Sequence, residues 1–361
     1  MKDDLHDKPT GSDPPEPALT PLGTVPEPPV RPRSGNTIHT APELAVGEGD
    51  VRSAELGELV RGTSLWRDAW QRLLKNKLAV VGIVFVLFIA VSSAGGPFLI
   101  KQLTGATPDF IPADAALIKA FPPFRAPDGS FSAQHPMGTD NQGRDLLARV
   151  LQGGQISLMV GIIATLMSLI IGVSYGAIAG YIGGRTDNIM MRIVDVLYSL
   201  PFIIIVIVLL SMFKKQTALG QLILLFVALG SVSWLTMARI VRGQVLSLKN
   251  QEFVLAARAT GVSTPRIIFR HLVPNTLGPV IVYATLTIPT VMLAEAFLSF
   301  LGFGVQPPFA SWGSLAASGS QNIAIYPWQL LGPGLTMGLT LFSLNFVGDG
   351  LRDALDPQMR K

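Results

Sequence analysis

The sequence contains no cysteine among its 361 residues, which excludes disulfide bridges, thiolate metal sites and cysteine nucleophiles. It also lacks a G-x-x-x-x-G-K-[ST] phosphate-binding loop, so the chain has no motif with which to hydrolyse ATP. His135 and His271 lack metal-ligand spacing with other histidines or acids, and no serine stands in a recognisable catalytic arrangement. These absences favour a protein that is not an enzyme and holds no metal or cofactor of its own.

Charged residues are scarce, at 14% of the chain, whereas a soluble domain carries about a quarter. Hydrophobic residues make up 49%, which fits a membrane protein. The net charge of +4 raises nucleic acid as an alternative partner. The basic residues, however, stand beside apolar runs, where they orient membrane helices, and we therefore expect no nucleic-acid binding.

Six apolar segments recur along the chain, and each approaches the roughly 20 residues that cross about 30 Å of hydrocarbon. We therefore predict an all-α fold, a polytopic membrane protein with six transmembrane helices. The segments lie at 78–95, 156–180, 196–213, 218–238, 278–300 and 330–348.

The distribution of basic residues orients these helices. Lysine and arginine concentrate before the first span, in the loop over 239–277 and at the C-terminus. Because positive charge stays on the cytoplasmic side, both termini and this loop are predicted to be cytoplasmic. The loop over 96–155 is then external, within a membrane domain that covers 78–361.

Two segments precede the membrane domain. Residues 1–62 are rich in Pro, Glu, Asp, Gly and Thr without a long apolar run, which predicts a disordered cytoplasmic tail rather than a signal peptide. A regulatory or docking tail is the alternative. Residues 63–77 predict an interfacial amphipathic helix, in which Ser64 is the N-cap. Its apolar face combines Trp66, Trp70 and Leu73.

The basic loop contains a predicted helix–turn–helix on the membrane surface. Good helix formers fill the run 252–260, and Gly261 ends it. A second helical turn begins at Thr264 with proline in its first turn and is predicted to end at Pro274. The small side chains of Ala256 and Ala257 in the first helix would allow close contact with a partner.

This loop resembles the coupling loop of ABC importer permeases, in which an Ala-Ala pair precedes a glycine that stands thirteen residues before a proline. Gly261 and Pro274 keep that spacing. Leu255 departs from the family, which usually has glutamate there, and Glu252 one turn upstream is the candidate for the acidic role. His271-Leu272-Val273 also replaces the family's Ile-x-Leu.

Other segments resemble the dipeptide/oligopeptide/nickel permeases in particular. The run 135–161 contains Gly-Thr-Asp and Gly-Arg-Asp-Leu-Leu, LSFLGFG at 298–304 leads into VQPPFASWG at 305–313, and VGDGLRDALDP lies near the C-terminus at 347–357. The resemblance covers about residues 64–361 and points to the C-type subunit of a peptide importer.

Three charged residues of the external segment have two interpretations. They either clamp the loop to the helix ends or contact an external substrate-binding protein. These residues are Asp140, Arg144 and Asp145.

Within the spans, Glu295 is the one ionisable residue of the fifth apolar segment. A carboxylate there is costly, so it either faces a pathway or gate or hydrogen-bonds to a neighbouring helix. Gly172, Gly176 and Gly180 repeat every four residues, which predicts close helix packing.

The resemblance implies a permease subunit of an ATP-driven importer of dipeptides or oligopeptides in the bacterial inner membrane. Its implied partners are a homologous second permease, two ABC ATPase subunits that bind ATP and Mg²⁺, and an external substrate-binding lipoprotein or periplasmic protein. Nickel, opine or glycan import by the same architecture is the alternative, and a stand-alone secondary transporter or a scaffold subunit is a rival of another class. The residues implied in coupling to the ATPases are Glu252, Ala256, Ala257, Arg258, Gly261 and Pro274.

Overall fold

In the computed structural model, residues 65–355 are described apart from 105–106, 113, 115–118, 127 and 214–216. The predicted tail over 1–62 and the Ser64 cap lie outside these residues. The described part consists of helices and loops, with two isolated β-bridges and no strand among the described residues. The predicted all-α fold is confirmed.

The helices follow one another with short connections, except for the long loop between α3 and α4. Two of the segments, η2 and η3, have π-helical hydrogen bonding. The elements are α2 (Leu65–Lys75), α3 (Lys77–Thr104), α4 (Leu146–Met167), η2 (Ser168–Val173), α5 (Ser174–Ile182), α6 (Gly184–Ser199), α7 (Phe202–Met212), α8 (Ala218–Leu248), α9 (Glu252–Ala259), α10 (Thr264–Arg266), η3 (Ile267–Leu272), α11 (Val273–Asn275), α12 (Leu277–Phe300), α13 (Trp312–Ser320) and α14 (Trp328–Leu355).

Among the described residues, five helices are long and apolar enough to cross a membrane, and each contains one of the predicted spans. They are Lys77–Gln102, Leu146–Ile182, Ala218–Leu248, Leu277–Phe300 and Trp328–Leu355. The α6–α7 pair brings the number to six when it is counted as one broken span. The chain is therefore a multi-pass membrane protein.

The predicted span over 196–213 is not one straight helix. The segment is broken between α6 and α7, which are bent by 81°. Pro201 lacks a backbone N–H and disfavours helical geometry in the residue before it. Leu200 accordingly has an extended backbone, with φ −82° and ψ 135°.

The glycine repeat brings α5 and η2 against α8 at backbone distance, which confirms the predicted close packing. A Cβ atom on Gly180 would lie 2.9 Å from the carbonyl oxygen of Arg242. A Cβ atom on Gly176 would overlap the carbonyl oxygen of Ala238. Residues with side chains at these positions would therefore push the two helices apart.

Helix α2 packs through a narrow face onto the ends of α3 and α14. Ala69 and Leu73 are buried together with Ala79 and Ala354. Trp70 is 56% exposed whereas Leu73 is buried, so the two residues do not lie together on one buried apolar face as predicted. The small side chain of Ala69 explains the difference, because it allows α14 to approach.

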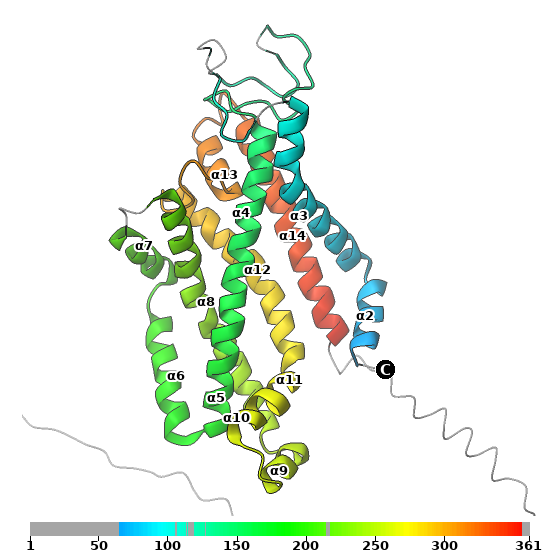
Figure 1. The fold of residues 1–361 in the computed structure, drawn as a ribbon, viewed down its shortest axis with the longest axis vertical. Helices are drawn as coiled ribbons and strands as arrows, with labels where there is room; N and C mark the ends of the chain where they lie inside the picture. Colours follow the sequence, from blue (N-terminus) through cyan, green and yellow to red (C-terminus); the bar gives the residue numbers. More distant parts are fainter. Residues whose placement is uncertain are drawn as a thin grey trace, which may run out of the picture. The chain divides into compact units, whose positions relative to one another are not determined.

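The two ends of the helical domain are built from different elements (Figure 1). Helix α9 lies at one end, with α10 and α11 beside it. The long α3–α4 loop and α13 lie at the opposite end. At the α9 end, the guanidinium of Arg242 donates to both carboxylate oxygens of Asp187 at 2.5 and 2.6 Å, which holds α6 against α8.

Candidate functional site

Helix α9 ends in a Schellman motif centred on Gly261. The N–H of Gly261 donates to the carbonyl of Arg258 at 3.1 Å, and the N–H of Val262 donates to that of Ala257 at 3.1 Å. Gly261 has a φ of +76°, which glycine adopts without strain. The predicted helix stop is therefore confirmed, and it fixes the turn that leads into α10.

The two alanines of α9 point in different directions. Ala257 is buried with Val254 in a cluster that includes Ala177 of α5, Val241 of α8 and Ile267 of η3. Ala256 is exposed. Only Ala256 is therefore available to another chain, whereas Ala257 allows α9 to approach the rest of its own membrane domain.

The exposed face of α9 contains residues that the sequence analysis did not single out as contacts. Leu255 and Phe253 are 48% and 39% exposed. Ala259 is also exposed, one turn after Leu255, and Glu252 is exposed one turn before Ala256. Positions i, i+3, i+4 and i+7 form one face of a helix, so this spacing could have identified the set 252, 255, 256 and 259.

Arg258 contacts its own chain at the edge of this face. Its guanidinium carbon lies 5.6 Å from the centroid of the Tyr181 ring, and its Nη2 lies 3.4 Å from the tyrosine hydroxyl. The stacking connects α9 to the end of α5. Arg258 is still exposed, so the contact leaves its charge accessible to another chain.

Pro274 does not end the second helical turn as predicted. It lies inside α11, and after Thr276 the chain continues into α12. Proline is tolerated there because it stands in the first turn of α11, where its missing N–H has no helical acceptor. The loop from α10 onward therefore forms a nearly continuous helical connection to α12.

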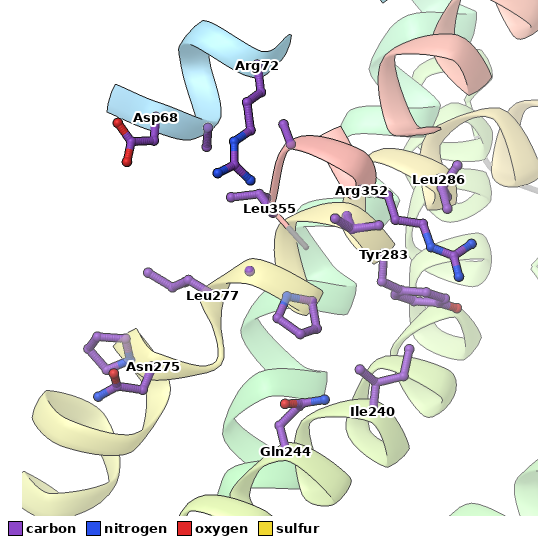
Figure 2. A pocket seen from close by; sticks show the side chains of 16 residues that line it. Asp68, Arg72, Ile240, Gln244, Asn275, Leu277, Tyr283, Leu286, Arg352 and Leu355 are labelled. Atoms are coloured by element: carbon purple, nitrogen blue, oxygen red, sulfur yellow. The ribbon is translucent and has the colours of Figure 1, made fainter. Parts of the chain in front are cut away.

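Beside this connection is a cavity of about 910 Å³. Its lining comes from α2, from the end of α8, from α11 and the start of α12, and from the end of α14 (Figure 2). Asp68, Arg72 and Arg352 contribute charged groups, and Gln244, Asn275 and Tyr283 contribute polar groups, to a lining that is otherwise mainly apolar. No sequence motif indicated this cavity, because its walls are far apart in the chain.

Glu295 lies in the interior of the fold rather than on an open surface, with 1% of its area exposed. Its Oε1 accepts hydrogen bonds from the hydroxyls of Ser299 and Ser311, each at 2.7 Å. Its Oε2 is buried without a hydrogen-bond partner, close to Gly313. The contacts favour the interpretation in which Glu295 holds α12 to the N-terminus of α13.

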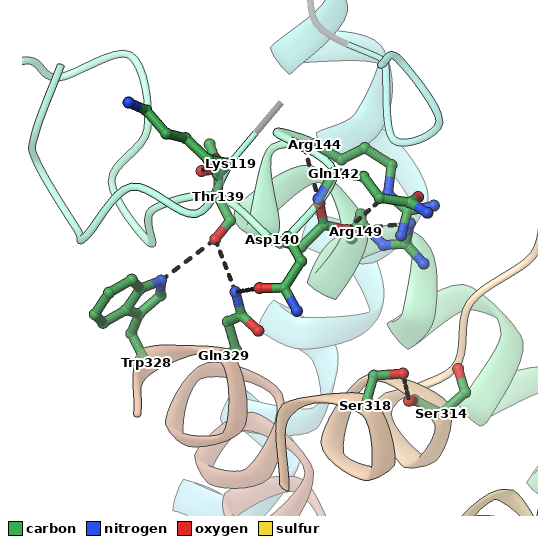
Figure 3. Close-up of polar contacts among 11 residues, drawn as sticks. Lys119, Thr139, Asp140, Gln142, Arg144, Arg149, Ser314, Ser318, Trp328 and Gln329 are labelled. Carbon is green, nitrogen blue, oxygen red and sulfur yellow. Dashed lines mark hydrogen bonds and ion pairs between the residues drawn. The ribbon is translucent and has the colours of Figure 1, made fainter. Parts of the chain in front are cut away.

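The charged residues of the external segment form a clamp at the start of α4 (Figure 3). Asp140 accepts from the Arg144 Nε at 2.7 Å and lies 3.6 Å from the Arg149 Nη1. Asp145 is the N-cap of α4, accepting from the backbone N–H of Ala148 at 2.7 Å, while its other oxygen lies 2.7 Å from His135. Asp145 is 4% exposed, so its role lies inside the clamp.

The same segment is anchored to α14. The indole N–H of Trp328 donates to the carbonyl of Thr139 at 3.3 Å, and the Gln329 amide donates to the Asn141 side chain at 3.0 Å (Figure 3). Asp140 and Arg144 keep part of their surface exposed beside this anchor. A partner approaching from this end would meet a rigid surface.

Within the part of the chain that the structure describes, no three His, Asp or Glu side chains gather in a way that could hold a metal ion. The residues described above can bind another chain, hold helices together and transmit movement between them.

Two protein families match this chain. The family described as binding-protein-dependent transport system inner membrane component matches residues 172–361. The family described as N-terminal TM domain of oligopeptide transport permease C matches residues 64–112. Together the two matches include the loop over 239–277, the cavity lining and Glu295.

Individual relatives match over most of their length. The oligopeptide transport system permease protein OppC of Haemophilus influenzae is 45% identical over 301 residues, which cover 83% of this chain and 91% of that protein. The dipeptide transport system permease protein DppC of Bacillus subtilis is 47% identical over 299 residues, which cover 82% and 87%. The inward-facing MetNI methionine ABC transporter is 20% identical, with a TM-score of 0.46, and covers 58% of this chain and 96% of its own.

Proposed function

The chain belongs to the family of binding-protein-dependent transport system inner membrane components, and from this membership we propose that it is a permease subunit of an ATP-driven importer of oligopeptides or dipeptides. The peptide class follows the names of relatives that are 45% and 47% identical. Its proposed partners are a homologous second permease, two cytosolic ATPases and an external substrate-binding protein. ATP and Mg²⁺ would be bound by the ATPases.

The observation that carries this proposal is the exposed face of α9. Phe253 and Leu255 present apolar surface in a loop that follows the basic end of α8, beyond the apolar part of the span. Exposed apolar residues gathered on one short helix mark a contact with another protein. The buried face of α9, formed by Val254 and Ala257, is already occupied by the chain's own core.

The proposed contact can transmit force because α9 is rigidly connected to the spans. Val254 and Ala257 are buried against α5 and α8, and the Schellman motif fixes the turn after Thr260. The connection through η3 and α11 leads directly into α12. A displacement of α9 by an ATPase subunit would therefore move α8 and α12 with it. Alternating access requires such a coupled movement of spanning helices.

We also propose that the α9 end faces the cytoplasm. Arginine and lysine concentrate at the end of α8, in the α9–α11 segment and around α2. The segment that follows α12 at the other end of the domain, residues 301–328, contains no charged side chain. The positive-inside rule supports this orientation, with the α3–α4 loop external.

Co-purification from native membranes tests the assembly. Two ATPase chains and a second permease should be recovered with this chain, and peptide together with the binding protein should stimulate ATP hydrolysis. A chain that purifies alone and transports on an ion gradient would contradict the proposal.

Competition for uptake tests the substrate class. Unlabelled dipeptides and oligopeptides should suppress uptake of a labelled peptide, whereas nickel, opines and glycans should not. Suppression by nickel with no effect of peptides would keep the architecture and overturn the peptide assignment.

A further inference from the structure

The cavity beside α11 contains two arginines that the coupling mechanism does not use. Arg72 comes from α2 and Arg352 from the last turn of α14. Within the described residues neither guanidinium has a hydrogen bond or ion pair, whereas the structure pairs Arg144, Arg239 and Arg242 with aspartates. Figure 2 shows Arg72 projecting from α2 toward Leu355 and Arg352 beside Tyr283. Asp68 of α2 also lines the cavity, so the two arginines leave it with a net positive charge, which favours an anionic ligand.

The remainder of the lining limits the ligand to an amphipathic molecule. The pocket floor is formed by apolar residues of α12 and α14, including Leu277, Val282, Leu286 and Leu355. Tyr283 and Gln244 add a hydroxyl and an amide that can donate to ester or hydroxyl oxygens. A volume of about 910 Å³ accommodates a headgroup together with the first part of an acyl chain.

The depth of the cavity fits the headgroup layer and its outer edge. Helix α8 carries no charge from Ala218 to Ala238, a stretch of about 31 Å at 1.5 Å per residue, which matches the roughly 30 Å of hydrocarbon. Ile240 and Gln244, which line the cavity, then lie about 3 and 9 Å beyond that boundary. The headgroup layer occupies about 5 to 8 Å on each side, so Ile240 lies within it and Gln244 lies at its outer edge.

We propose that this cavity binds an anionic phospholipid from the leaflet at the α9 end, with the phosphate held by Arg72 and Arg352 and an acyl chain on the apolar floor. Basic pockets between membrane helices on the cytoplasmic side bind such headgroups. The lipid would fill the space between α2 and the α11–α12 connection, and so it would brace the interfacial helix against the coupling segment. This inference rests on the membrane fold and not on the peptide assignment.

Native mass spectrometry of the purified full complex tests the proposal. It measures the lipid bound during titration with phosphatidylglycerol or with phosphatidylcholine. The wild type should retain phosphatidylglycerol in preference to phosphatidylcholine. The double variant Arg72→Gln/Arg352→Gln should bind phosphatidylglycerol about 30-fold more weakly, because each arginine near a membrane surface contributes on the order of 1 kcal/mol.

A charge-matched control removes two exposed arginines that do not line the cavity. Arg67→Gln/Arg192→Gln loses the same charge and should bind phosphatidylglycerol like the wild type. Subunit stoichiometry in the same spectra shows whether each variant assembles, and the single variants Arg72→Gln and Arg352→Gln provide the measurement if the double variant does not.

Four results would overturn the proposal. The first is undiminished phosphatidylglycerol binding by the double variant, and the second is an equal loss in the control. The third is inorganic phosphate binding as tightly as the lipid, which would indicate a free-anion site. The fourth is displacement of the lipid by a peptide with a free carboxylate, which would place the cavity on the transport route.

Discussion

At Gly261 the backbone has a φ of +76°, and the Schellman hydrogen bonds on either side depend on it. A side chain in this conformation costs roughly 1–2 kcal/mol, least for asparagine. Among the described residues, apart from the two chain neighbours, no atom would lie within 4 Å of a Cβ at Gly261, so the constraint is conformational rather than steric crowding.

Substitution of Gly261 should therefore act through the backbone. Gly261→Val and Gly261→Pro should disorder the turn after α9 and abolish ATP-coupled uptake while the protein stays in the membrane. Proline has the additional effect of removing the N–H that donates to the carbonyl of Arg258. Gly261→Asn should retain most uptake. Assays of peptide uptake with immunoblots of the membrane fraction check this, and normal uptake by well-expressed Gly261→Pro would refute the rigid connection.

Glu295 offers a second test at this scale, because its contacts separate a structural role from a gate. Glu295→Ala leaves the hydroxyls of Ser299 and Ser311 without their acceptor, at a cost of about 1–3 kcal/mol for each unsatisfied group. Glu295→Gln keeps an oxygen acceptor. The thermal unfolding temperature of the purified complex should therefore fall far more in Glu295→Ala than in Glu295→Gln. Uptake should decrease in the same order as stability. Loss of uptake in a fully stable Glu295→Gln variant would instead support a gate.

Helix α8 is the element that connects the two ends of the molecule, and its contact with α5 depends on glycine. Gly176 leaves no room for a Cβ beside the carbonyl of Ala238. Gly243, on α8 itself, has no atom within 4 Å of the corresponding position. The same substitution should therefore have opposite effects at these two helical glycines.

Gly176→Ala should lower the thermal stability of the complex, because the helices must separate, whereas Gly243→Ala should be neutral or stabilising by up to about 1 kcal/mol through helix propensity. Melting curves in detergent with matched lipid provide the comparison. Equal melting temperatures for the two variants would mean that the α5–α8 contact adjusts more easily than its geometry indicates.

The elements also show how far the sequence could predict the structure. Apolar length located five spans, and Gly261 located the end of α9, because both depend on local chemistry. The break at Leu200–Pro201 was missed because the apolar run continues through it. The inward direction of Ala257 and the bonding of Glu295 to Ser311 depend on α5, α8 and α13, whose positions no local pattern contains.

For the whole molecule, the orientation in the membrane is a prediction from charge, and the absence of native cysteine makes it simple to test. Ala133 lies exposed in the α3–α4 loop, and Thr186 lies exposed near the start of α6, at the α9 end but outside the proposed ATPase contact. In intact cells, a membrane-impermeant maleimide should label Ala133→Cys and should label Thr186→Cys only after the membrane is opened. The reverse pattern would invert the proposed topology.

In the proposed complex, coupling to the ATPases depends on one small surface, the exposed face of α9. Ala256 lies on it, whereas Ala133 is an exposed alanine at the other end of the molecule. A glutamate at either position is accepted by the fold, because neither side chain is buried, but only the change on α9 places a charge and extra volume in the proposed ATPase contact.

The central claim is most directly tested by ATP-driven uptake of a labelled oligopeptide into proteoliposomes that contain the reconstituted complex and its binding protein. Ala256→Glu should reduce both uptake and peptide-stimulated ATP hydrolysis at least tenfold, a loss of about 1.4 kcal/mol in the contact, while Ala133→Glu should match the wild type. Wild-type uptake by an assembled Ala256→Glu complex would contradict the assignment of α9 as the coupling contact.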